Sequence, residues 1–139
     1  MSESELISYK FHGIEEPYSI LNKRPDEFDG KVYTFSVSVT EKADEVRELL
    51  VLFVNIKIFN EDSSILLADM EVACGFNIEN FSKHIKKNDI GVFDVPEKLS
   101  TTLSVISIST ARGYVFSKLK GTYLHKAVLP IISGLKKEK

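Results

Sequence analysis

The side chains able to do acid–base, nucleophilic or metal chemistry are few in this sequence and widely spaced. The three histidines, His12, His84 and His125, lie far apart, and none stands in a metal-ligand spacing such as HExxH. The single cysteine, Cys74, excludes an intrachain disulfide and argues against a thiolate zinc site. No GxSxG nucleophile turn and no glycine-rich phosphate loop is present. The sequence therefore predicts no catalytic residue, no metal site and no cofactor.

Length and composition are those of one ordinary domain. The chain has 139 residues, of which 43% are hydrophobic and 27% are charged, which predicts a globular domain rather than disorder. We expect no membrane span and no signal peptide, and the lone cysteine suits a reducing compartment, so the expected location is cytoplasmic. We expect a flexible N-terminus at 1–8, a single domain at 9–132 and a basic tail at 133–139.

The net charge of −2 conceals an asymmetry along the chain. Residues 1–71 carry a net charge of −8, whereas residues 72–139 carry +6. Solvated faces of one domain explain this, and the functional alternative is an acidic surface for a basic partner or a basic surface for nucleic acid. The basic residues are dispersed and no aromatic–basic RNA-binding motif appears, so we do not expect nucleic acid as a partner.

Four segments have the pattern of antiparallel strands. In the first of them Gly13 and Pro17 predict a sheet edge, because proline cannot sit in the middle of a ladder. The polar residues 60–63 join the last two into a hairpin. The strands are expected at 9–21, 32–40, 46–59 and 64–78, and alternation of apolar and polar residues marks the last three.

The strand at 64–78 has two different faces. The even positions from Leu66 to Phe76 are apolar, and Cys74 among them is expected to be a small buried hydrophobe. Leu67 and Asp69 fall on the other face, which we expect to be exposed, because burying an unpaired carboxylate is costly.

A long helix is predicted at 96–119. Asp94 can cap it, Pro96 suits its first turn, and Gly121 follows its last turn as a stop signal. The β-branched residues of TTLSVISI, 101–108, make a strand the alternative, but the caps and the length favour a helix. A short helix is expected before it, between residues 80 and 87.

The predicted long helix has apolar residues on two sides. Leu103, Ile106, Thr110 and Gly113 fall in one arc, while an arc that includes Ile108, Ala111 and Val115 lies roughly opposite. Because a surface helix of a monomer needs one apolar stripe, we expect a homo-oligomer with the first four residues at its interface. The alternative is a helix covered within its own fold.

At this point the residues resemble a known family, the SecB protein-export chaperones and their SecB-like relatives. The resemblance rests on the hairpin LLVLFVNIKIFNEDSSILLADMEVACGFNI and on ISTARGYVFSKLKGTYLHKAVLPII, and it covers about residues 9–132. It implies an α+β fold, with a four-stranded antiparallel sheet packed by a long helix, and dimers that pair into tetramers. It also implies an ATP-independent holdase that delivers unfolded preproteins to a SecA-type motor.

The resemblance also implies roles for residues of the strand at 64–78. Ala68, Met70 and Val72 match positions near bound client, and Leu67 and Asp69 match positions that contact the motor. One departure is clear, since only IISGLKKEK follows Pro130, where typical members have a second helix. This departure favours a SecB-like chaperone dedicated to one client, such as an antitoxin.

Two functions of other classes remain as alternatives. A hot-dog-like thioesterase would need a carboxylate or histidine at the start of the long helix, where Asp94 and Glu97 are the only candidates. Both residues are explained by their place at a helix end. A purely structural oligomerisation partner is the third hypothesis.

Overall fold

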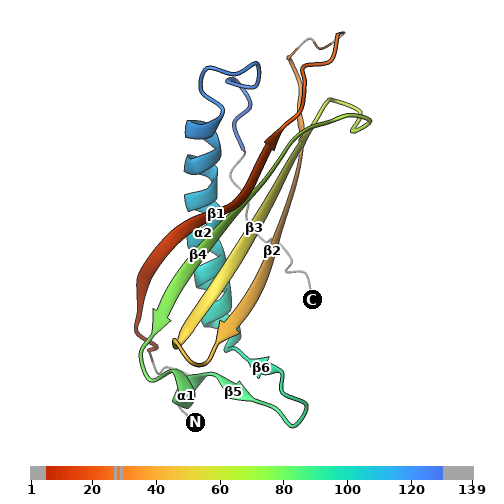
Figure 1. Ribbon diagram of the computed structural model, residues 1–139. Coiled ribbons are helices and arrows are strands. Elements are labelled where there is room, and N and C mark those ends of the chain that lie inside the picture. Colours follow the sequence, from red (N-terminus) through yellow and green to blue (C-terminus); the bar gives the residue numbers. More distant parts are fainter. Residues whose placement is uncertain (1–5, 27, 29, 130–139) are drawn as a thin grey trace.

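The protein, in a computed structural model, is a four-stranded antiparallel sheet with one long helix laid along one of its faces (Figure 1). The structure describes residues 6–26, 28 and 30–129. The predicted α+β class, the sheet and the helix are confirmed. In chain order the elements are β1 (Tyr9–Leu21), β2 (Thr34–Asp44), β3 (Leu49–Phe59), β4 (Leu66–Ile78), α1 (Phe81–His84), β5 (Lys86–Lys87), β6 (Phe93–Asp94) and α2 (Glu97–Lys118).

The strands lie in the order β1-β4-β3-β2, so β1 and β2 are the two edges of the sheet. Tight turns join β2 to β3 and β3 to β4, which confirms the predicted hairpin. Val46 was expected to begin a strand, but it lies in the first turn and is 92% exposed. The reason is local, because the Asp44 carboxylate accepts hydrogen bonds from the main-chain N–H and the Nε of Arg47, which closes the turn.

The two edges of the sheet differ in regularity. The pairing of β1 with β4 shifts register between Phe11 and Gly13 and again between Glu15 and Tyr18, around Pro17. These irregularities confirm the predicted edge strand. The pairing of β2 with β3 instead runs through all its residues without a shift.

The core lies between the sheet and α2. Alternate side chains of β3 and β4, from Leu50 to Ile58 and from Ala68 to Ile78, point to the helix and are buried. The helix meets them with a face on which three serines lie between larger apolar residues, and small side chains let the helix approach the sheet closely. The buried helix residues are Leu99, Ser100, Leu103, Ser104, Ser107, Ile108, Ala111 and Val115.

The prediction of two opposite apolar arcs on the helix is therefore wrong. Leu103 from one arc and Ile108 from the other both pack in this single core, because the serines between them are buried as well. Leu103 has no exposed surface and is removed from the expected oligomer interface. Ile106 and Thr110 are half-buried and Gly113 is exposed, so these three stay available to a partner.

The predicted stop signal of α2 is correct, but its predicted N-terminal cap is not. Residue Gly121 has φ of 80°, a left-handed conformation that suits glycine after a helix, and this confirms the predicted stop. The predicted cap is wrong, since Asp94 belongs to β6 and Pro96 stands at the N-cap without a side-chain hydrogen bond. The expected short helix is α1, but it ends at His84, and Lys86–Lys87, which were expected in that helix, form β5 and pair with β6.

Residues just before the predicted domain boundary at residue 9 also contact the rest of the fold. Ile7 is half-buried against the core, and the Ser8 carbonyl accepts a hydrogen bond of 2.9 Å from the Glu79 N–H. Residues 1–5 and the basic tail at 133–139 lie outside the described residues. Neither helix in the described part of the chain is both long and apolar enough to cross a membrane.

Candidate functional site

The three residues expected to contact a client lie in the core. Ala68, Met70 and Val72 are at most 1% exposed, because α2 covers the side of β4 from which they project. They present no surface to a polypeptide in this structure, so the prediction that they form the client-binding site is wrong.

Leu67 also lies elsewhere than predicted. It has no exposed surface and belongs to the core, although simple alternation placed it on the open face with Asp69. The cause is an irregularity at the start of β4, where Ala68 pairs with Ile58 but Leu66 pairs with Phe59. Leu67 is the extra residue at this bulge, which turns its side chain to the core.

Asp69 does lie on the sheet face opposite α2, which we call the open face, and there it belongs to a hydrogen-bonded group from three strands. The Tyr18 hydroxyl donates to Asp69 Oδ1 at 3.1 Å, and Asn55 Nδ2 donates to the same oxygen at 3.0 Å. Lys57 Nζ donates to Asn55 Oδ1 at 2.8 Å. These four residues form the polar cluster. The sequence pointed to Asp69 alone, because its partners lie on other strands.

The polar cluster holds a carboxylate in one fixed position. The pKa of Tyr18 is raised above its ordinary value, first by burial and then by its hydrogen bond to Asp69. The tyrosine therefore stays a neutral donor, and Glu71 lies beside it across the β1–β4 pair. Such a group can receive a cationic side chain of a partner, but it offers no acid–base pair.

A shallow hollow of about 200 Å³ opens on the same face, near the register shifts of β1. Its floor includes Leu49, Val51 and Ala73, and Arg47 and His12 are among the residues that line it. The His12 ring lies 3.2 Å from the Asn77 side-chain oxygen. The floor of the hollow is mainly apolar, and its volume would accommodate one large side chain of a partner.

A row of large apolar side chains is exposed on the α2 side of β1. Tyr9, Phe11, Ile14 and Leu21, which we call the β1 row, are 39–52% exposed and pair with core positions of β4. The rings of Tyr9 and Phe11 pack on Phe76, with centroids 6.1 and 5.0 Å apart. From Tyr9 to Ile14 the row extends about 17 Å. Leu21 stands apart, beyond Glu16, whose carboxylate lies 3.2 Å from Lys118 Nζ of α2. The row is thus a short apolar stretch with one outlying leucine, next to the buried residues that had been expected to bind the client.

The outward side of α2 forms a second surface with little charge. Thr102, Val105, Ser109, Gly113 and Phe116, which we call the outer stripe, follow one another at helical spacing and are all exposed. Val105 is 56% exposed and Phe116 is 48% exposed. The outer stripe contains no charged residue, which suits contact with another protein surface rather than with water alone.

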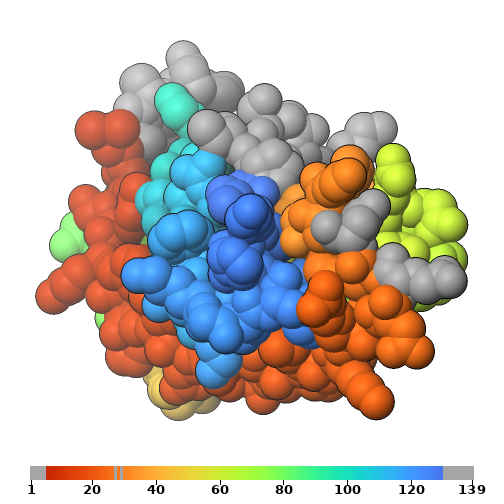
Figure 2. Space-filling view, turned by 90° about the horizontal axis from the view of Figure 1, so that it is seen from above, coloured from red at the N-terminus to blue at the C-terminus, as the bar shows by residue number. Residues whose placement is uncertain are grey.

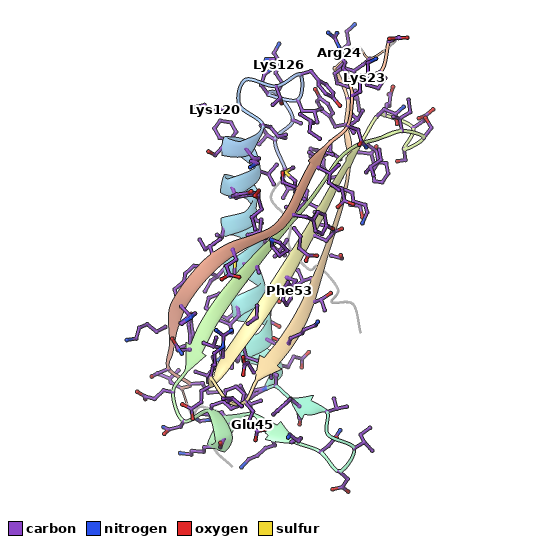
Figure 3. All side chains as sticks on the ribbon, viewed as in Figure 1. Lys23, Arg24, Glu45, Phe53, Lys120 and Lys126 are labelled. Carbon is purple, nitrogen blue, oxygen red and sulfur yellow. The ribbon has the colours of Figure 1, made fainter. Side chains whose placement is uncertain are left out.

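Charged side chains gather near the ends of the molecule. Lys23, Arg24, Lys120 and Lys126 point outward at one end, and Glu45 lies at the other (Figure 3). Seen from the basic end, the segment after α2 lies between β1 and the residues that lead to β2 (Figure 2). A hydrogen bond of 2.7 Å from the Tyr123 hydroxyl to the Asn22 carbonyl closes this end. At the other end Glu45 pairs with Lys87 at 3.0 Å, so only the first end is clearly basic.

The candidates for catalysis are not brought together. Asp94 and Glu97 are both exposed, and no group of three His, Cys, Asp or Glu among the described residues could hold a metal ion. Cys74 is buried as expected, and burial raises the pKa of its thiol although the neighbouring Ser107 hydroxyl opposes this. The thiol is therefore a poor nucleophile.

No protein-family model matches this chain, and no curated protein matches it in sequence. Its fold is similar to a solved structure of the Mycobacterium tuberculosis Rv1957 SecB-like chaperone, in complex with a ChAD peptide from the Rv1956 HigA1 antitoxin. The two chains are 17% identical, the match covers 90% of this chain and 88% of the other, and the TM-score is 0.58. The chain therefore has the fold of a SecB-like chaperone.

Proposed function

We propose that this protein is an ATP-independent chaperone that binds unfolded polypeptides. The observation that carries the proposal is the β1 row, which exposes apolar side chains along about 17 Å of one sheet edge, from Tyr9 to Ile14, with Leu21 farther along the strand. An unfolded chain exposes apolar side chains at intervals, so a sheet edge with exposed apolar side chains can bind it without reading a particular sequence. The proposed function requires binding and no catalytic residue. We also propose a cytoplasmic location, because the free thiol of Cys74 suits a reducing compartment.

A dedicated client is favoured over general preprotein export. The fold is similar to that of a chaperone solved with an antitoxin peptide, which supports one dedicated client. The burial of Leu67 removes half of the expected contact with a motor protein. The test is the refolding of a denatured protein with a stoichiometric amount of this one, with and without ATP, and protection should not depend on ATP.

Asp69 remains as a proposed contact with a SecA-type motor. If the polar cluster receives a cationic side chain, the change Asp69→Lys should abolish the attraction and weaken binding, most clearly at low salt, because charges interact within about 8 Å at physiological ionic strength. Binding is measured by titration of a SecA-type motor at two salt concentrations. Absence of wild-type binding at low salt would remove the export function and leave the dedicated chaperone.

The outer stripe is the proposed interface for a second copy of the chain, in a dimer or tetramer. Among the described residues, apart from the neighbouring backbone of α2 itself, nothing lies within 4 Å of a Cβ placed on Gly113, so Gly113→Leu should leave the protomer folded. At a helix–helix contact the added side chain would separate the helices, which should shift the assembly to smaller species. Light scattering measures the mass, and circular dichroism provides the control for folding. An unchanged mass would exclude Gly113 from the interface, and a wild-type monomer at tens of micromolar would contradict the oligomer.

A further inference from the structure

The charged side chains of the open face lie in rows that cross the four strands. In one row Lys57 on β3 lies directly opposite Asp69 on β4. Another row contains Lys10 on β1 and Asp44 on β2, because each of them pairs with one member of the same β3–β4 pair. Since the strand order is β1-β4-β3-β2, the cation and the anion of each row lie on opposite sides of the line between β4 and β3.

These charges stay largely available within one copy of the chain. Among the described residues no ion pair joins Lys57 to Asp69, and Lys57 Nζ instead donates to a neighbouring side-chain amide at 2.8 Å. Lys10 is exposed, and Asp44, which pairs with Arg47, keeps 37% of its side chain exposed. Of the described helices and strands, α2 lies on the other face of the sheet, and α1, β5 and β6 lie beyond its end (Figure 1).

The middle of the open face has a large side chain beside a hollow. Phe53 on β3, which is half-buried, lies opposite Ala73 on β4, and Val51 lies opposite Gly75. The hollow of about 200 Å³ lies over Ala73 and Gly75, because their side chains are small or absent. Figure 3 shows Phe53 near the middle of the sheet, away from both ends of the molecule. A face of this shape can accept a large side chain and can also supply one.

From these observations we propose that two copies of the chain associate through their open faces, about a two-fold axis that runs parallel to the strands. Such an axis places β4 of one copy on β3 of the other, and each row meets the same row of the second copy. Asp69 then meets Lys57 of the second copy, and Lys10 meets Asp44. Phe53 of each copy lies over the hollow of the other. This association goes beyond the proposed chaperone function and uses a surface other than the outer stripe.

The positions of the charges select this orientation over the alternative one. A two-fold axis through the same centre but perpendicular to the strands would place each strand on its own copy and reverse the order of the rows. Lys57 would then meet Leu49, and Asp69 would meet Asn77, so no opposite charges would come together. A second copy is also favoured over an unrelated partner, because the two-fold symmetry by itself supplies a cation for each anion.

The size of the open face predicts a transient association. From Asp69 to Asn77 a strand extends about 27 Å, and four strands span about 20 Å, so two copies together bury roughly 1,000 Å². This area is near the lower limit for a specific interface. The facing charges are partly exposed, so the association should weaken as the salt concentration rises. A second copy covers Asp69, so self-association and the binding of a basic partner at Asp69 exclude each other.

Two single charge reversals, Asp69→Lys and Lys57→Asp, supply the test. Each one alone brings like charges together twice in the symmetric pair, so self-association of either variant should be about tenfold weaker than that of the wild type. An equal mixture of the two variants should regain the association, because one variant has two cations at these positions and the other has two anions. Sedimentation equilibrium measures the association at low and high salt, and circular dichroism shows whether each variant is folded. Lys23→Asp, a reversal at the exposed basic end, is the control and should leave the association unchanged.

Recovery in the mixture identifies a contact between copies, because within each variant the two positions still carry like charges. If the mixture associates no better than either variant alone, the open-face pair is overturned. The pair is also overturned if the wild type does not self-associate at low salt, or if both reversals leave its association unchanged, in which case the outer stripe stays as the proposed interface. None of these results affects the chaperone proposal, which the refolding assay tests separately.

Discussion

Leu67→Ala should lower the free energy of unfolding by about 2–5 kcal/mol, the usual cost of removing a fully buried leucine side chain. The side chain has no exposed surface and packs within the core below α2. Since small domains are stable by only about 5–15 kcal/mol, a loss of this size should move the urea midpoint strongly. The measurement is urea unfolding at one fixed protein concentration, followed by circular dichroism.

Ile65→Ala is the matched control for this prediction. Ile65 lies two residues earlier, is 42% exposed and precedes the strand, so its truncation should cost much less than that of Leu67. If β4 began without the bulge, Leu67 would face the open side of the sheet with Asp69. A small cost for Leu67→Ala would support that arrangement and contradict the one in this structure.

The strands, the hairpin and the long helix were predictable because their signals are local and repeated. Alternation over a dozen residues located β3 and β4, and polar residues between them marked the hairpin. Gly13 and Pro17 interrupt the regular hydrogen-bonded pairing of β1, and this predicts an edge position without any knowledge of which strand lies beside it. Such signals act within a single segment and need no knowledge of its neighbours.

The candidate site was less predictable because it depends on contacts between segments. A single extra residue at the start of β4 reversed the side of Leu67, and periodicity contains no sign of such a bulge. The three residues expected to bind the client are covered by α2, and the buried side of that helix could not be chosen from the sequence while both apolar arcs were counted. The polar cluster joins Tyr18, Asn55 and Asp69 from three strands, so only the assembled sheet reveals it.

The residues of the β1 row have a signal in the sequence. A strand at 9–21 that lies at the edge of the sheet has a neighbouring strand on one side only. Its large apolar side chains therefore remain partly exposed to solvent unless another surface covers them. Tyr9, Phe11, Ile14 and Leu21 are such residues. An edge strand rich in apolar side chains is itself a reason to expect a binding partner.

Phe11→Ser combined with Ile14→Ser should remove most of the protection that the wild type gives to an unfolded protein. The two side chains are 43% and 52% exposed in the middle of the β1 row, so the change interrupts the apolar path while leaving most of the core in place. Protection is measured as light scattering during refolding of a denatured protein, at a stoichiometric amount of each variant. Ile14→Ser alone provides a milder version, since Phe11 stacks on Phe76 and its loss also costs stability.

The control for this last prediction removes apolar surface elsewhere. Ile90 and Val92 are 82% and 54% exposed in the segment between β5 and β6, away from the β1 row. Ile90→Ser combined with Val92→Ser should keep full protection, because an apolar tip offers a client no continuous path. If the control variant lost protection and the β1 variant kept it, the client would bind at the β5–β6 hairpin. Equal loss in both variants would mean that protection follows total apolar surface, and the β1 row would then have no special part in holding the client.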